Sequence, residues 1–454
     1  MGFENIEKWS ASYHHLKKWV QFWHSDVFYR SVTVLHEENI PDKGHLIFTP
    51  NHQNALMDAL ALLFTVNRRM VFMARSDIFK KKFIAAILYF LRILPIYRIR
   101  DGYDSLKKNK ASFQKTVDVL TNEECALVIL PEGNHAGIRR LRPLKKGFAR
   151  IAFQAEEATG FTLDMQIVPV GIDYSNYQNF RSRLTVNFGR PIAVSKYYEQ
   201  YKENPAVAIN AIKNELSEEI KKLIIHIETE EYYELFNTLR KLYLKRFSDR
   251  LEKDLTDENL LPFQRSIVNQ LNNILKSSPD TIDQLNKKVQ VYLKKLKQIK
   301  LEDEYVIYKF SRKDQLLPFL FLLVTSPLYV YGVLNNIIPA AISIWSKNKI
   351  KDPQFKSSFL YVVSLLAFPL FYILQTLVLI FLISKWYWIF IYFFSLPATA
   401  VFVLFYINLW RKFRKSLLIC SLFKKKKAFM EQLQKEYGNI LNFMDKIILP
   451  EAEE

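Results

Sequence analysis

TPNHQNALMD, residues 49–58, joins the two patterns that decide the fold. The run 46–49 is short and apolar, as in a buried strand, and apolar residues recur with helical period over 55–66. The same alternation continues along the chain. Further strand-like runs lie at 32–35, 70–73, 126–130, 166–172 and 184–188, with helix-like stretches at 79–94, 105–120 and 146–155. This pattern predicts an α/β domain with a mixed or mostly parallel sheet flanked by helices, and a site at the loop ends.

His52 and Asp58 are candidates for a catalytic pair. Side chains six positions apart cannot share one face of a continuous helix, but they can meet if His52 lies in the loop and Asp58 in the first helical turn. We expect Asn54 to cap that helix. Asp58 would orient the imidazole, whose other nitrogen would take a proton from a substrate hydroxyl. The motif offers no nucleophile, so direct transfer is expected; a purely structural His and Asp is the alternative.

Three further segments carry candidate chemistry. Pro131-Glu132-Gly133 follows another buried strand, and a basic stretch at 139–146 follows it; this stretch would clamp phosphate or form a solvated face. Arg98 closes the apolar segment 93–100, where an arginine would bind phosphate or simply lie at the surface. Pro169 interrupts the apolar strand 167–171, which predicts a sheet edge or a strand end.

Taken in order, these segments resemble the phospholipid/glycerol acyltransferase family. The family has an Asn-His motif followed by Asp, an Arg after a short apolar strand, a Pro-Glu-Gly motif, and an apolar strand with Pro. The residues that match these motifs are Asn51, His52 and Asp58, then Arg98, then Pro131, Glu132 and Gly133, and last Pro169. The resemblance covers roughly residues 25–195.

The resemblance implies transfer of a fatty acyl group from a thioester to a glycerol hydroxyl. His52 and Asp58 would be catalytic, and no cofactor is implied, because acyl-CoA or acyl carrier protein enters as a co-substrate. The positions implied to contact substrate are Asn51, Arg98, Glu132, Gly133 and Pro169, with Arg98 near the phosphate. The implied acceptor is glycerol-3-phosphate or dihydroxyacetone phosphate, and lysophosphatidic acid is the alternative.

The spacing of the first motif departs from the common family pattern. The family usually has four residues between His and Asp, whereas five separate His52 from Asp58, so the loop before the helix must absorb one more. This spacing, the basic stretch after Pro-Glu-Gly and the hydrophobic C-terminal region together resemble one branch. That branch comprises the fungal-type glycerol-3-phosphate/dihydroxyacetone-phosphate acyltransferases and their bacterial relatives. A catalytically inactive membrane lipid-binding protein is the alternative that the altered spacing supports.

The C-terminal part of the chain predicts membrane insertion. Lys, Arg, Asp, Glu and His are all missing from three runs, 315–346, 357–384 and 386–410. A spanning helix needs about 20 apolar residues, so each run is long enough. The loop 347–356 carries four Lys and one Asp, and 411–427 carries eight basic residues and no acidic one, which predicts that both are cytoplasmic.

This charge pattern constrains the topology. Three full spans would put one basic segment outside, so we expect the second and third runs to form a hairpin that turns near Lys385. The first run contains three prolines and would be a broken or re-entrant segment. The sequence therefore predicts an integral membrane protein with its catalytic domain on the cytoplasmic side.

The regions around the α/β domain are helical. Apolar residues with helical period at 9–27 predict an amphipathic N-terminal helix, lying in a bilayer interface or packed on its own domain. Residues 201–311 predict scaffold helices broken near Pro262 and Pro279. We therefore divide the chain into an N-terminal helix, an acyltransferase domain, a helical region, a transmembrane region and a basic cytoplasmic tail, at 1–30, 31–200, 201–311, 312–412 and 413–454.

Composition narrows the partners. The net charge of +19 predicts an anionic partner, either nucleic acid or a membrane surface. Much of this charge flanks the apolar runs and no nucleic-acid motif occurs, so membrane lipids are favoured over nucleic acid. A metal hydrolase using His52, Asp58, Glu132 and His135 is disfavoured, because Pro131 and Gly133 disrupt the helix that would align Glu132 with His135.

Overall fold

The computed structural model describes residues 6–96, 105–123, 125–135, 137–251, 256–299, 301 and 313–448. The chain forms two compact units, each containing segments distant in sequence. The first comprises Met1–His226, Thr256–Pro262 and Ile350–Tyr361, and the second comprises Ile227–Leu255, Phe263–Lys349 and Val362–Glu454.

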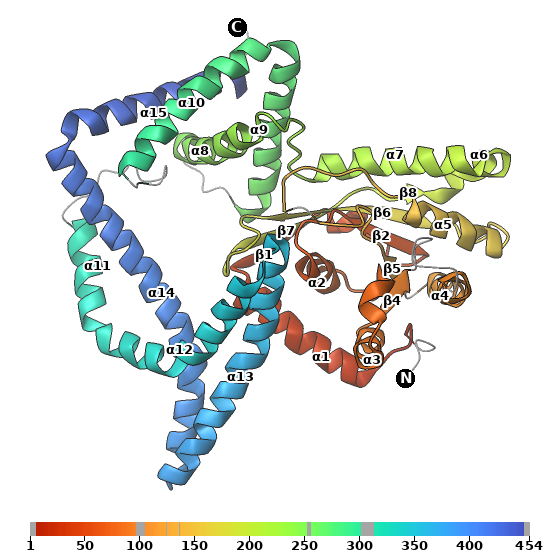
Figure 1. The fold of residues 1–454 in the computed structure, drawn as a ribbon, viewed down its shortest axis with the longest axis horizontal. Helices are drawn as coiled ribbons and strands as arrows, with labels where there is room; N and C mark the ends of the chain where they lie inside the picture. Colours follow the sequence, from red (N-terminus) through yellow and green to blue (C-terminus); the bar gives the residue numbers. More distant parts are fainter. Residues whose placement is uncertain are drawn as a thin grey trace. The chain divides into compact units, whose positions relative to one another are not determined.

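An eight-stranded sheet forms the centre of the first unit (Figure 1). Its strands are β1 (Ser31–Leu35), β2 (Leu46–Pro50), β3 (Arg69–Arg75), β4 (Ile93–Ile96), β5 (Cys125–Val128), β6 (Gln166–Tyr174), β7 (Arg183–Phe188) and β8 (Ile192–Ala193). The order is β1-β7-β6-β2-β5-β3-β4, with β8 also paired to β6. All pairs are parallel except β6 with β7 and β6 with β8, which confirms the predicted mixed sheet.

Helices flank this sheet. The first unit contains α1 (Ala11–Phe22) with the π-helical η2 (Trp23–Phe28), α2 (Leu56–Thr65), α3 (Lys82–Phe90), α4 (Ser105–Leu120), α5 (Gly147–Ala158), α6 (Tyr198–Glu203) and α7 (Pro205–Leu223). Its 3₁₀ turns are η3 (Glu37–Asn39), η4 (Ser76–Phe79), η6 (Val194–Tyr197) and η8 (Pro353–Phe355). Successive strand residues point to opposite faces, and one face carries Ile47, Leu127 and Ile167 into a core with α4, α5 and α7.

Two expectations about the strands are wrong in detail. The helix expected over 79–94 ends at Phe90, because Arg92 has a φ of +60° that no helical residue adopts, and β4 follows. Pro169 is not at a sheet edge, since β6 lies between β2 and β7. Pro169 falls where the second partner of β6 changes from β8 to β7, so its missing N–H breaks neither antiparallel ladder.

The amphipathic N-terminal segment forms α1 and η2. Tyr13 is buried, and its ring packs 6.2 Å from that of Phe90 on the adjacent helix α3. Trp9, Trp19 and Phe22 remain exposed. The segment therefore packs on its own domain along one side and presents aromatic residues on the other.

The second unit is helical in the part of the chain described. Its helices are α8 (Tyr233–Leu251), most of α9 (Asp257–Ser277), α10 (Pro279–Ile299), α11 (Lys313–Val324), α12 (Ser326–Lys349), most of α13 (Lys356–Leu382), α14 (Trp386–Lys425) and α15 (Lys427–Ile448). The predicted break at Pro279 is confirmed, since α10 begins there. The break at Pro262 is wrong: this residue lies inside α9, which continues through it at the cost of one backbone hydrogen bond.

Three helices are long and apolar enough to cross a membrane, spanning Ser326–Lys349, Pro353–Leu382 and Trp386–Lys425. The first apolar run is interrupted as expected, since α11 ends at Val324 and α12 begins at Ser326. The remaining helix α12 is still 24 residues long. Buried polar contacts join the three helices, because Asn336 of α12 accepts a 2.7 Å hydrogen bond from the Tyr372 hydroxyl of α13 and donates to the Leu396 carbonyl of α14.

Candidate active site

His52 and Asp58 meet at the carboxyl end of β2. His52 lies in the loop after the strand, and Asp58 lies in the first turn of α2. The His52 Nδ1 atom is 2.9 Å from Asp58 Oδ2. Asp58 is fully buried, whereas 16% of the His52 side chain is exposed. An Nδ1–H donated to the carboxylate leaves Nε2 of His52 as the proton-accepting nitrogen.

Ala55 has an unusual backbone conformation in this loop. This residue has a φ of +44°, in the region that favours glycine, immediately before α2 begins. Asp58 Oδ2 also accepts hydrogen bonds of 2.7 Å from the backbone N–H groups of Gln53 and Asn54. These bonds fold the loop back over the helix start and bring His52 within reach of Asp58.

Asn54 does not cap α2 with its side chain, contrary to expectation. Ala55 occupies the cap position, and the Asn54 amide instead donates to the Tyr177 carbonyl and accepts from the Ser357 hydroxyl. The polar group at the start of α2 is Asp58, whose carboxylate also favours the helix dipole.

Asn51 connects the His52 loop to the neighbouring strand β6. Its side chain donates to the Ile172 carbonyl at 3.1 Å and accepts from the Ile172 N–H at 2.6 Å. The side chain is buried and both ends of its amide bond to backbone. In this structure Asn51 therefore holds the loop in place.

Glu132 braces the same loop from the other neighbouring strand. It lies in the turn after β5, where Oε1 accepts a 2.6 Å hydrogen bond from the His52 N–H and Oε2 accepts one of 3.0 Å from the Arg142 N–H. Burial raises the pKa of this carboxyl to about 7, and the two N–H donors and nearby Arg142 act in the opposite direction. Because β2 and β5 pair in parallel, the His52 and Glu132 loops leave the sheet at the same edge.

The remaining candidate residues have different positions. Gly133 has a φ of +66° in the turn and lines the cavity described below. Pro169 pairs with Thr49 in the strand before the His52 loop. Arg98 lies outside the described residues.

The basic stretch divides into buried and exposed groups. Arg139 is buried, forms an ion pair with Asp173 and donates to the Tyr174 carbonyl, so it stabilises the fold. Arg142 has 28% of its side chain exposed near Glu132, and Lys145 is exposed beside Gly133. Arg142 and Lys145 are therefore the members of this stretch placed beside the site.

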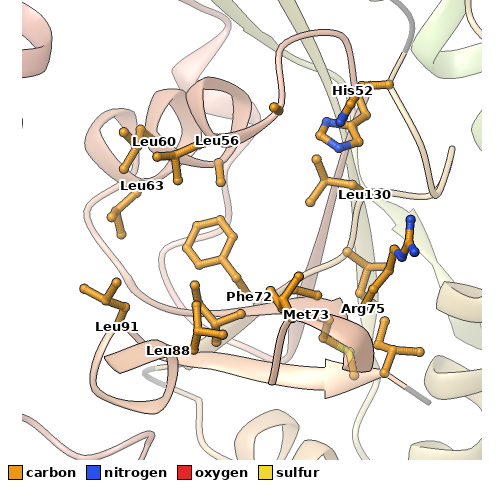
Figure 2. A pocket seen from close by; sticks show the side chains of 18 of the residues that line it. His52, Leu56, Leu60, Leu63, Phe72, Met73, Arg75, Leu88, Leu91 and Leu130 are labelled. Carbon is orange, nitrogen blue, oxygen red and sulfur yellow. The ribbon is translucent and has the colours of Figure 1, made fainter. Parts of the chain in front are cut away.

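An apolar cavity of about 480 Å³ opens beside His52 (Figure 2). Figure 2 shows His52 at one end and Leu88 and Leu91 at the other, with Phe72 between them. The wall comes from α1, α2, α3 and the ends of β3, β4 and β5; it includes Leu16, Leu56, Leu60, Leu63, Ile93 and Leu130. The volume lies within the range of about 300–1,000 Å³ typical of small-molecule sites.

Sequence reasoning missed two contributors to the site, Tyr174 and Phe355, and considered a third, His135, only as a metal ligand. Tyr174 of β6 donates to Asp58 Oδ1, His135 packs edge-on against His52 with ring centroids 5.1 Å apart, and Phe355 lines the cavity. In the part of the chain described, no three His, Cys, Asp or Glu side chains are grouped to hold a metal. Tyr174 and Phe355 carry no local signal, because distant segments bring them to the site.

Comparison with known proteins identifies the domain that holds these residues. Residues 31–173 match the family model described as Acyltransferase. The chain carries an acyltransferase-family domain. The His52 loop, the Glu132 turn and most of β6 all fall within the matched residues.

The region of this chain that is similar to other proteins extends beyond the acyltransferase domain. Glycerol-3-phosphate O-acyltransferase 2 of Saccharomyces cerevisiae is 26% identical over 321 residues, which cover 66% of this chain and 42% of the yeast protein. Glycerol-3-phosphate O-acyltransferase 1 of the same yeast is 27% identical over 197 residues, covering 43% of this chain and 25% of that protein. The chain thus matches less than half the length of either relative.

A solved structure is also similar in part. The crystal structure of the 1-acyl-sn-glycerophosphate acyltransferase PlsC from Thermotoga maritima aligns with 46% of this chain and 80% of its own chain. The TM-score is 0.32 and the sequence identity is 18%.

Proposed function

We propose that this protein transfers a fatty acyl group from acyl-CoA or acyl carrier protein to a hydroxyl of glycerol-3-phosphate or dihydroxyacetone phosphate. One observation carries the proposal: the His52–Asp58 pair, with an Nδ1–Oδ2 distance of 2.9 Å, lies at one end of an apolar cavity. A general base and a space for an acyl chain are thereby adjacent. The relatives named glycerol-3-phosphate O-acyltransferases support the choice of acceptor.

In the proposed reaction, Nε2 of His52 takes the proton from the acceptor hydroxyl as its oxygen attacks the thioester carbonyl. The tetrahedral intermediate then collapses, the carbon–sulfur bond breaks, and the leaving thiolate takes the proton back from the imidazolium. Asp58 remains ionised and stabilises the imidazolium, as the carboxylate of a catalytic triad does. No covalent acyl-enzyme forms on this route.

The acyl chain would occupy the apolar cavity, with the thioester carbonyl beside His52. Leu56, Leu60 and Phe72 would contact the chain, since they line the cavity between its two ends (Figure 2). Burying each methylene is worth about 0.8 kcal/mol, so a cavity of this kind favours a long-chain donor.

The acceptor phosphate requires cations on the outer side of His52. Arg142 and Lys145 are the candidates near the Glu132 turn, and Arg98 is a candidate from its motif. Substrate contacts at Asn51, Glu132, Gly133 and Pro169 belong to the proposal, although Asn51 and Glu132 would act mainly by fixing the His52 loop.

We further propose that the apolar helices anchor the protein in a membrane with the catalytic domain on the cytoplasmic side. Their length and composition support insertion. The segment Ile350–Tyr361 between α12 and α13 belongs to the same compact unit as the catalytic loop, which supports a shared side for the catalytic domain and this loop.

The test is an acyl-transfer assay with membranes containing the full chain. Labelled palmitoyl-CoA is supplied with glycerol-3-phosphate, dihydroxyacetone phosphate or lysophosphatidic acid, and the series is repeated with acyl carrier protein as donor. Wild type is expected to acylate a small acceptor, and His52→Ala to lose at least about 100-fold in rate. Acylation of lysophosphatidic acid alone would instead support a second-step enzyme. Labelling of no acceptor with either donor would support an inactive lipid-binding protein.

A matched histidine variant controls for nonspecific damage. His36 is exposed at the surface. Its φ of +56° is a backbone conformation that asparagine tolerates. His36→Asn is expected to keep wild-type activity. Equal loss in His36→Asn and His52→Ala would contradict the catalytic assignment of His52.

A further inference from the structure

The segment Ile350–Tyr361 connects two apolar helices, yet it belongs to the compact unit of the acyltransferase domain. It contains the 3₁₀ turn η8 and the first residues of α13. Asp352 caps this turn by accepting a 3.1 Å hydrogen bond from the Gln354 N–H. The turn therefore has a defined shape, and it presents the Gln354 and Phe355 side chains together.

Both of these side chains contact His135. The Gln354 Oε1 atom accepts a hydrogen bond from Nδ1 of His135, and the Phe355 ring packs edge-on against the imidazole with centroids 4.6 Å apart. His135 in turn packs against His52. An acceptor at Nδ1 fixes the protonated nitrogen and the orientation of the His135 ring. Phe355 also forms part of the cavity wall, as do His52 and His135.

The start of α13 adds a second attachment to the catalytic loop. The buried Ser357 hydroxyl donates a 2.6 Å hydrogen bond to Oδ1 of Asn54, whose backbone N–H is bonded to Asp58. Four residues later, the Tyr361 hydroxyl donates to the Val20 carbonyl in α1 at 2.8 Å. The segment is therefore connected to the loop that holds His52 and to the helix that lines the cavity.

We infer that Gln354, Phe355 and Ser357 are positioning residues of the active site, and that the connector between α12 and α13 is a working part of the catalytic unit. The inference rests on the proposed function. Gln354 orients His135 against His52, Ser357 fixes the loop through Asn54, and Phe355 closes the cavity beside the thioester. A fixed base and the exclusion of water both favour transfer to the acceptor over hydrolysis.

The experiment compares variants of the full chain in membranes. Gln354→Ala removes the acceptor for His135, Gln354→Glu keeps an acceptor oxygen, and Phe355→Ala opens the cavity wall. Phe359→Ala is the matched control, because Phe359 lies in the first turn of α13 and its side chain is exposed. For each variant we would measure kcat, the KM values of acceptor and donor, and thioester hydrolysis without acceptor.

Gln354→Ala is expected to lower kcat about tenfold with KM values nearly unchanged, because base orientation acts on the chemical step. Gln354→Glu is expected to restore most of that kcat. Phe355→Ala is expected to raise the ratio of hydrolysis to transfer about tenfold, since water gains access to the thioester. Phe359→Ala is expected to match wild type in all measurements.

A double-mutant cycle separates positioning from general destabilisation. If Gln354 acts through His135, Gln354→Ala should lower kcat no further in a His135→Ala background. Equal effects of Gln354→Ala in both backgrounds would overturn its assignment. Thermal unfolding of each variant in detergent identifies any loss of folded protein.

The proposed function and this inference can fail separately. Absence of acyl transfer by wild-type protein would contradict the proposed function. Active wild-type protein together with Gln354→Ala and Phe355→Ala variants that behave like Phe359→Ala would overturn the inference alone.

Discussion

The hydroxyl of Tyr174 donates a 2.9 Å hydrogen bond to Oδ1 of Asp58, across 116 residues of sequence. Both side chains are completely buried. Tyr174 ends β6, next to the strand that leads into the His52 loop, so the bond fixes the Asp58 carboxylate against the sheet. Each Asp58 oxygen thus has its own hydrogen-bond donors, since Oδ2 accepts hydrogen bonds from His52 and from the loop backbone.

Tyr174→Phe tests this relationship. Loss of one donor should cost about 1 kcal/mol of stability and let the carboxylate move, so kcat should fall about tenfold with little change in KM. The measurements are acyl-transfer kinetics and thermal unfolding. Tyr197→Phe removes a hydroxyl–carboxylate contact with Glu215 outside the site and should leave kcat unchanged. An unchanged kcat in Tyr174→Phe would show that Asp58 is held without this bond.

The far end of the cavity should limit donor chain length. Leu88→Trp places a larger side chain opposite His52 in the cavity (Figure 2). Long-chain donors should then lose about tenfold in kcat/KM relative to short ones, because a few methylenes of burial are lost. Parallel assays with lauroyl- and oleoyl-CoA measure this ratio. Phe83→Trp on the same helix is the control, since Phe83 is 78% exposed; an equal ratio in both variants would place the acyl chain elsewhere.

Glu132 should make the stability of the catalytic unit depend on pH. Its pKa is raised from 4.5 to about 7, so the folded protein retains a proton that the unfolded chain releases. The stabilising contribution is complete below pH 4.5 and is lost as the pH rises through about 7. A shift of this size corresponds to about 3 kcal/mol.

Glu132→Gln should flatten the dependence of the unfolding temperature on pH over this window. Below pH 4.5 it should also lower stability by about 1 kcal/mol, because the amide nitrogen cannot accept the backbone N–H bond that the second carboxyl oxygen accepts. Thermal unfolding in detergent across the window measures both effects. Glu203→Gln, at an exposed position, should keep the wild-type slope. A wild-type slope in Glu132→Gln would assign the pH dependence to other groups.

The polar contacts of Asn336 should stabilise the apolar helices. Asn336→Leu would leave the buried Tyr372 hydroxyl without its acceptor and remove the bond to the Leu396 carbonyl. The expected loss is about 1–2 kcal/mol, the size of interhelical hydrogen bonds measured in membranes. Unfolding in detergent would measure it, together with Tyr372→Phe and the double variant. Additive losses would show that the two side chains are not coupled; Asn348→Leu, at an exposed position, is the control.

Some features of the fold follow directly from local sequence. The six strands expected from apolar runs are present, because a buried parallel strand needs a continuous apolar stretch that is visible in sequence. β4 and β8 were not expected, since they are only four and two residues long. The expectation of a sheet edge or a strand end at Pro169 is wrong, because sequence does not reveal where β6 changes its pairing partner.

In the candidate site, too, some features follow from local sequence and others depend on contacts between distant segments. Local sequence predicts the His52–Asp58 motif and the turn at Glu132, because these polar residues immediately follow or begin regular elements. It also determined the three apolar runs, since their length alone distinguishes them. Local order of this kind depends on periodicity and on residue types a few positions apart.

How the His52–Asp58 pair is held, and what surrounds it, depends on contacts between segments that are distant in sequence. Tyr174 contacts Asp58 because β6 lies beside β2. Gln354 and Phe355 contact His135, although 219 residues separate His135 from Gln354 in sequence. The positive φ of Ala55 lets a longer loop close on Asp58. Such contacts depend on packing between distant segments, for which a single sequence carries no periodic signal.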